Sequence, residues 1–169
     1  HWGYVAASPA LWPCVFMALA ALAGEVRPLY ISKGDQPAEA IATSTPFVMA
    51  LISLGGIGPA VATQVAASLV DDLRNRRGLS KTAFNAGQYT LSVVAARATY
   101  SALAGLPFFG GPVVVDVTHL LPLLAGGVVM VVVNRVLVAV VVAIASAQPL
   151  QAILRDEAKF FAVTQVVLL

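Results

Sequence analysis

Residues 113–147 read VVVDVTHLLPLLAGGVVMVVVNRVLVAVVVAIASA and form the longest apolar stretch of the chain. A helix that crosses a bilayer needs about 20 apolar residues, and two crossings that turn at Asn134-Arg135 would leave about 17 residues each. Neither glycine nor proline marks such a turn. We therefore predict an irregular start, broken at Pro122 and at Gly126-Gly127, followed by a single helix to about Ala147. A double crossing is the alternative.

The composition of the whole chain also favours a membrane protein. Of 169 residues, 59% are hydrophobic and 11% are charged, against roughly 25% charged in soluble domains, and the mean hydropathy is +0.87. A soluble domain of this composition would expose a large apolar surface. The net charge of +2 argues against nucleic acid as a partner, and the single cysteine, Cys14, excludes an internal disulfide. We expect residues 1–169 to form one integral membrane domain.

Other apolar stretches occupy residues 8–24, 43–70 and 82–104. The second contains Gly55-Gly56-Ile57-Gly58-Pro59, which predicts two short helices around a break. Together, the stretches predict an all-α fold, a polytopic transmembrane bundle of about six helices with a Gly/Pro-broken pair near residues 55–59. The last apolar run, 160–169, is only ten residues long, and the chain starts at His1. We therefore expect a fragment of a longer protein.

The basic residues predict an orientation. Eight of the ten Lys and Arg residues lie in three polar segments that we predict to be loops, 25–42, 71–81 and 148–159, whereas residues 55–59 and 105–112 contain none. Because cytoplasmic loops carry an excess of Lys and Arg, we predict that the three basic segments lie on the cytoplasmic side of the membrane. Without a turn at the Gly/Pro break, Arg27 and Lys33 would lie outside. The segment 71–81 also suits anionic lipid headgroups.

A polar stripe marks the stretch 82–104. Asn85, Gln88 and Ser92 are spaced by three or four residues and share one helical face, with Tyr89 beside them. In a membrane helix such a face points into the bundle. There it forms either interhelical hydrogen bonds or the wall of a small-molecule pocket.

Charged residues also lie within or beside the apolar stretches, where a charge is costly without a partner. For Arg97 we expect Asp116 or a helix-end carbonyl as partner, with an anionic ligand or snorkelling as alternatives. The same alternatives apply to Arg135, and we expect the neighbouring Asn134 to form a hydrogen bond between helices. Asp116 and His119, three residues apart, suit a proton relay or a metal pair, but a water-facing pair is the simpler interpretation. The candidate ligand-binding residues are therefore Asn85, Gln88, Tyr89, Ser92, Arg97, Asp116 and His119, and we predict no catalytic or metal-binding residue.

Two neighbouring segments carry a family resemblance: residues 69–77, LVDDLRNRR, and residues 81–92, KTAFNAGQYTLS. The acidic-basic segment followed by the pattern KxxFNxxQYxLS resembles the N-terminal membrane region of bacterial cyclic-di-GMP signalling proteins. Thr45-Pro46-Phe47 and Gly58-Pro59-Ala60-Val61 also fit, so the resemblance covers about residues 43–155. In that family a multi-helix membrane sensor precedes cytoplasmic diguanylate cyclase (GGDEF), phosphodiesterase (EAL) or HD-type output domains. The motifs of those domains do not occur in this sequence.

The resemblance implies a membrane-embedded sensory and anchoring module that regulates a cytoplasmic output domain for cyclic-di-GMP turnover. Catalysis would lie in that missing domain, so we expect no enzyme activity and no cofactor here. The expected partners are the lipid bilayer, an unknown small-molecule ligand and further copies of the full-length protein. The run from Gly58-Pro59-Ala60 to Ser68-Leu69-Val70-Asp71-Asp72 also resembles the substrate-binding subunits of energy-coupling-factor vitamin importers. A small-molecule importer subunit is therefore the alternative function.

Overall fold

The structure is a computed structural model that describes residues 11–27, 29–33, 36–41, 43–110 and 117–155. Helices account for most of these residues, which confirms the helical fold class. The elements are α2 (Leu11–Val26), β1 (Leu29–Lys33), β2 (Gln36–Ile41), α3 (Thr45–Leu54), α4 (Ile57–Arg74), α5 (Leu79–Ala104), the short 3₁₀ turn η1 (Val117–His119) and α6 (Leu120–Ser146). The predicted last helix, 160–169, lies outside the described residues.

The segment 25–42, predicted as a loop, contains an antiparallel hairpin. Strand β1 pairs with β2 so that Leu29 lies opposite Ile41 and Lys33 opposite Gln36. Pro37 did not prevent strand formation, because both strands of a two-stranded sheet are edge strands, where a missing N–H donor is tolerated.

The glycine-rich break forms a turn, as predicted. Helix α3 ends at Leu54 and α4 begins at Ile57. Gly56 adopts a φ of 80°, a conformation that residues with a side chain rarely adopt. A Cβ atom there would also lie 2.8 Å from the carbonyl oxygen of Gly110. Pro59 lies in the first turn of α4, where its missing donor costs no hydrogen bond. The turn therefore requires glycine at position 56.

The predicted breaks at Pro122 and Gly126-Gly127 are wrong, since α6 is one continuous helix of 27 residues from Leu120 to Ser146. Pro122 lies in its first turn, where proline is tolerated. The role of Gly126 is close packing, because a Cβ atom there would lie 2.9 Å from the Ala96 carbonyl oxygen and 3.1 Å from Met49 Cε. The apolar stretch 113–147 thus contains one long helix, as we predicted in preference to two crossings.

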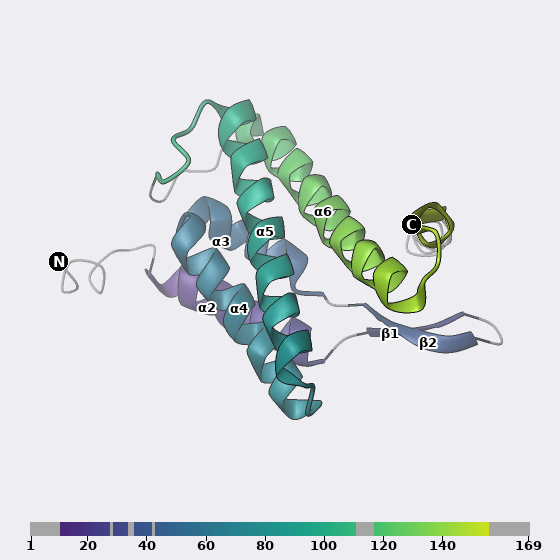
Figure 1. The fold of residues 1–169 in the computed structure, drawn as a ribbon. Helices are drawn as coiled ribbons and strands as arrows, with labels where there is room; N and C mark the ends of the chain where they lie inside the picture. Colours follow the sequence, from purple (N-terminus) through teal and green to yellow (C-terminus); the bar gives the residue numbers. More distant parts are fainter. Residues whose placement is uncertain (1–10, 28, 34–35, 42, 111–116, 156–169) are drawn as a thin grey trace.

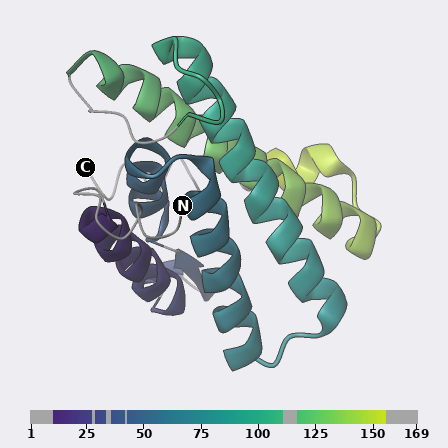
Figure 2. The same cartoon turned by 90° about the vertical axis from the view of Figure 1, so that its left-hand side faces the viewer.

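Helix α5 is the centre of the bundle and packs antiparallel against α4 on one side and α6 on the other, while α2 and α3 complete the bundle around α4 (Figures 1 and 2). The hairpin, the α4–α5 turn and the end of α6 lie towards one end, which we call the charged end (Figure 1). The α3–α4 turn and residues 105–110 lie at the opposite end, where the Arg97 side chain joins them. For the hairpin and the α4–α5 turn, this grouping agrees with the one that the basic residues predict.

The apolar core lies where α3, α5 and α6 meet. Val48, Leu51 and Ile52 of α3 pack with Val93, Ala96 and Tyr100 of α5, and Ala21, Ala60 and Met130 complete the cluster. Small residues at these contacts allow the helices to approach closely. The core therefore fixes how α3 and α6 sit against α5.

Polarity is distributed unusually over the described residues. Twelve hydrophobic residues are buried, but so are ten polar or charged ones, while 22 large hydrophobic side chains are exposed. Among the latter, Trp12, Phe16 and Leu19 form the outer face of α2 and are at least 61% exposed. Of the described helices, only the one over Val117–Ser146 is both long and apolar enough to cross a membrane; Leu11–Val26 and Thr45–Leu54 are apolar but shorter.

Candidate functional site

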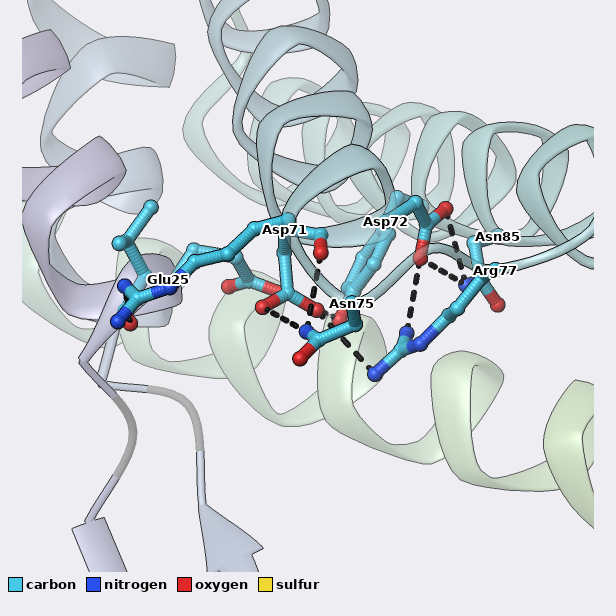
Figure 3. A network of polar contacts seen from close by, with 9 residues as sticks. Glu25, Asp71, Asp72, Asn75, Arg77 and Asn85 are labelled. Atoms are coloured by element: carbon cyan, nitrogen blue, oxygen red, sulfur yellow. Dashed lines mark hydrogen bonds and ion pairs between the residues drawn. The ribbon is translucent and has the colours of Figure 1, made fainter.

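A network of charged and amide side chains, the charged network, joins the end of α4 to the start of α5 (Figure 3). Its centre is Asp72, whose side chain is only 1% exposed. Asp72 Oδ1 accepts hydrogen bonds from Arg77 Nη1 at 2.8 Å and from Asn85 Nδ2 at 2.9 Å. Charge-assisted hydrogen bonds of this kind are the stronger ones in proteins. Asp72 therefore holds the turn between the two helices together.

Asp71 extends the charged network towards solvent. Its carboxylate lies 3.2 Å from Arg77 Nη2, and it accepts a hydrogen bond from Asn75 Nδ2 at 2.8 Å. The Arg77 side chain is 42% exposed, so this pair is partly solvated. On the same turn, Arg74 Nη1 donates to the carbonyl oxygen of Val26 at 3.2 Å and so links the network to the end of α2.

Glu25 forms a second polar cluster on the inner side of α2. Its carboxylate accepts hydrogen bonds from Tyr89 of α5 and from Ser44, which precedes α3, both at 2.7 Å. The residue is only 7% exposed. One carboxylate thus connects three helices. Sequence analysis missed this role because Glu25 lies at the end of an apolar stretch and its partners are 19 and 64 residues away.

The remaining polar-stripe residues contact α6 and the main chain of α5. Gln88 Nε2 donates to Asn134 Oδ1 at 2.9 Å, and Ser92 Oγ donates to the Gln88 carbonyl oxygen at 2.8 Å. The stripe of Asn85, Gln88, Tyr89 and Ser92 therefore reaches three other helices, α4, α6 and α2. Each member of the stripe thus has a polar contact within the described residues, but Gln88 Oε1 is buried without a hydrogen-bond partner there. No member of the stripe lines the groove described below.

Arg97 is fully buried near the opposite end of α5. Its Nε donates to the Phe108 carbonyl oxygen at 2.9 Å, Nη2 to those of Pro107 at 2.8 Å and Gly110 at 3.3 Å, and Nη1 to that of Ile52 at 3.1 Å. Ile52 lies in the last turn of α3, whose carbonyls have no partner within the helix. The predicted helix-end carbonyl is therefore a partner of Arg97. The other predicted partner, Asp116, lies outside the described residues.

His119 ends η1 and lies against Tyr100 of α5. The two rings meet edge to face with centroids 6.4 Å apart. The predicted pairing of His119 with Asp116 falls on a residue outside the described ranges. Within residues 11–110 and 117–155, apart from the gaps in that range, no group of three His, Cys, Asp or Glu side chains could hold a metal ion.

An open groove of about 870 Å³ lies between α3 and α6. From α3 it is lined by Thr45, Pro46, Met49, Ala50, Ser53 and Leu54, and from α6 mainly by leucine and valine residues between Leu123 and Val136. Arg135 is the one charged residue among those that line it, and Leu154 closes one side. Sequence analysis missed this groove because it depends on how two distant helices pack.

Gln64 is a further residue that sequence analysis missed. It lies in the middle of α4, is fully buried, and neither its side-chain oxygen nor its nitrogen has a hydrogen-bond partner among the described residues. A buried amide without partners destabilises a fold. No signal in the local sequence distinguishes Gln64 from an exposed glutamine.

No family model, curated protein or solved structure matches this chain.

Proposed function

We propose that this chain is a membrane-embedded sensory and anchoring module whose charged end faces the cytoplasm and acts on a signalling output there. The observation that carries the proposal is the reversed polarity of the bundle. Glu25, Gln64, Asp72 and Arg97 are buried, while aromatic and aliphatic side chains cover α2 and α6. In lipid, polar and ionised residues face the bundle interior and apolar ones face outwards. In water the same surface would be an aggregation hazard.

The arrangement of the loops supports the orientation. Among the described residues, the hairpin, the basic α4–α5 turn and the end of α6 lie towards the charged end, whereas the α3–α4 turn and residues 105–110, which contain no Lys or Arg, lie at the opposite end (Figure 1). The excess of basic residues on one side is typical of the cytoplasmic face. We include in this proposal a bundle of about six helices that cross the membrane. Helix α6 is long enough to cross alone, and the shorter apolar helices pack against it or against its neighbours.

The contacts also support a route for a signal. Helix α5 is bonded at one end to the loop 105–110 through Arg97 and at the other to the α4–α5 turn through Asn85 and Asp72. A small displacement of α5 at the end that carries Arg97 would therefore act on the charged network at its other end. Small helix shifts are one of the established forms of allosteric change. The nature of the output, cyclic-di-GMP turnover, rests on the resemblance of residues 69–92 to that family.

Membrane insertion and orientation are tested by labelling single cysteines in a Cys14→Ser background. Ser80→Cys at the charged end and Phe109→Cys at the opposite end form a matched pair, since both positions are exposed. In intact cells we expect a membrane-impermeant maleimide to label Phe109→Cys alone, and both variants after the cells are permeabilised. Extraction of the chain by alkaline carbonate, or labelling of both positions in intact cells, would contradict the proposal.

The signalling role is tested with the natural gene in its source bacterium. We expect the cellular concentration of cyclic-di-GMP to change when the gene is deleted and to return when it is restored. Asp72→Asn, which disrupts the charged network, is expected to alter the restored concentration, whereas Asp71→Asn is expected to alter it less. An unchanged concentration in the deletion strain would reject the cyclic-di-GMP output and leave membrane embedding intact.

A further inference from the structure

We propose that the groove between α3 and α6 holds an acyl chain of an anionic phospholipid from the leaflet on the charged side, with the lipid phosphate at Arg135. Because this inference rests on the proposed membrane embedding, its test separates the two. The groove is a binding site distinct from the polar stripe that the sequence suggests.

The chemistry of the lining suits a hydrocarbon chain. Apart from Thr45, Ser53 and Arg135, the residues that line the groove are apolar. Met49 and Val131 form facing parts of the wall, and Gly127 leaves room beside Met49, whose Cγ lies 3.7 Å from the position a Cβ would occupy. Burial of methylene groups in such a lining is favourable when they come from water. From bilayer lipid the gain is smaller, so the headgroup must supply the preference.

The groove has a polar end and an apolar end. Helices α3 and α6 run in opposite directions along α5. Ile52 of α3 and His119, which precedes α6, contact Arg97 and Tyr100. Ser44, which precedes α3, is joined to Tyr89 through Glu25, and Asn134 of α6 bonds the adjacent Gln88. Thr45 and Arg135 therefore lie towards the same end of the groove. The polar end is the one towards the charged end of the bundle, since Ser44 next to Thr45 contacts Glu25. Along α6, Leu124 and Arg135 are separated by about 16 Å. One leaflet of a bilayer core is about 15 Å thick, so the groove matches one acyl chain in length and direction.

Arg135 gives the groove a preference for negative charge. It is the only charged residue among those that line the groove, and it is half-buried. A guanidinium group presents five donors in a planar fork that fits phosphate oxygens. Arg135 also interacts within the chain, and five donors allow both contacts. Beside Leu154 in the chain, exposed Arg155 adds positive charge near the same end.

The test measures lipid binding to residues 1–169 purified in a mild detergent. Dioleoyl phosphatidylglycerol, dioleoyl phosphatidylcholine and sodium oleate are added separately, and bound lipid is counted by native mass spectrometry. We expect phosphatidylglycerol to bind about fivefold more tightly than phosphatidylcholine, the gain expected for one basic residue near an anionic lipid. Oleate, which lacks a phosphate and a second chain, is expected to bind more weakly than phosphatidylglycerol.

Three variants locate the site. Arg135→Gln is expected to reduce phosphatidylglycerol binding to the level of phosphatidylcholine, and Arg135→Lys to retain part of the preference. Arg76→Gln, a matched change on the exposed α4–α5 turn, is expected to leave the preference unchanged. Gly127→Leu is expected to weaken both phospholipids, because its side chain would fill the groove. Circular dichroism of each variant confirms that it is folded.

The outcomes distinguish the inference from the proposed function. Equal binding of the two phospholipids, an Arg135→Gln variant that keeps the preference, or tighter binding of oleate would overturn the lipid site while leaving membrane embedding intact. If alkaline carbonate removes the chain from membranes, the proposed membrane embedding is rejected, and the lipid site that rests on it is rejected as well. An Arg76→Gln variant that loses the preference would place the lipid on the turn and would also overturn the inference.

Discussion

The guanidinium of Arg97 in α5 donates a hydrogen bond to the carbonyl oxygen of Ile52 in α3 across 3.1 Å. A buried cation thereby provides a hydrogen-bond donor for a carbonyl group in the last turn of a ten-residue helix. The same side chain donates to three carbonyls of the loop 105–110. Main-chain oxygens supply all four of these hydrogen bonds, and they come from two segments far apart in the sequence.

Replacement of Arg97 is expected to be the most destabilising single change in the described bundle. Arg97→Met leaves several buried carbonyls without a donor, at about 1–3 kcal/mol for each group left unsatisfied, so we expect a loss of at least about 3 kcal/mol in the free energy of unfolding. Arg97→Lys should recover only part of this loss, because an ammonium group cannot reproduce the planar fork. Detergent-based unfolding followed by tryptophan fluorescence measures both. Unchanged stability of Arg97→Met would favour the ligand interpretation of this residue.

The two acidic residues at the end of α4 are expected to differ in their contributions. Asp72 is buried and accepts charge-assisted hydrogen bonds, worth about 1.5–3 kcal/mol, so Asp72→Asn should lower the free energy of unfolding by about 2 kcal/mol. Asp71 is partly solvated, and pairs of this kind contribute about 0–1 kcal/mol. Asp71→Asn is therefore the matched control. Equal losses in the two variants would show that the charged network is held by solvent-exposed charge rather than by Asp72.

The adjacent glycines of α6 are expected to respond to alanine in opposite directions. At Gly126 the new Cβ would lie 2.9 Å from a main-chain oxygen, and such overpacking costs about 1–3 kcal/mol. At Gly127 the nearest atom is 3.7 Å away, so Gly127→Ala should gain roughly 0.5–1 kcal/mol from the better helix propensity of alanine. Melting temperatures of the two variants test the contrast, which a loss of stability at position 127 would refute.

The buried amide of Gln64 is expected to destabilise the protein. Gln64→Leu replaces an unpartnered amide with an apolar side chain of similar size. We therefore expect the melting temperature to rise and the free energy of unfolding to increase by about 1–2 kcal/mol. Gln88→Leu is the comparison, because it breaks the hydrogen bond to Asn134 and should lose roughly 0.6–2 kcal/mol. If Gln64→Leu is destabilising, Gln64 has a partner that the described residues do not include.

Features that depend on local sequence could be predicted. Glycine and proline punctuate the chain at residues 55–59, and the structure confirms the turn there because φ at Gly56 requires glycine. The same reasoning failed in α6, where Gly126 serves close packing against α5 rather than a break. The sequence alone does not distinguish a glycine that forms a turn from one that allows close packing, because the difference depends on the neighbouring helix.

Features that depend on distant contacts could not be predicted. The spacing predicts the polar stripe, and Asn134 is an expected helix–helix contact that its hydrogen bond to Gln88 confirms. Nothing in the sequence, however, pairs Asn134 with Gln88 or Glu25 with Tyr89. The acceptors of Arg97 are main-chain oxygens, which every residue possesses, so no pattern of side chains predicts them. The groove between α3 and α6 could not be predicted either, because the residues that line it come from two segments about 80 residues apart.

Helix α5 is held near both ends, by Asn85 to α4 and by Arg97 to the loop 105–110. These two residues are twelve positions apart, which corresponds to about 18 Å of uninterrupted helix. Such a segment resists compression and bending, so it behaves as a strut. A displacement of residues 107–110 would be transmitted to the α4–α5 turn as a rotation or translation of the whole helix. Under the proposed function, movement on one side of the bundle would reach the other side in this way without melting any helix.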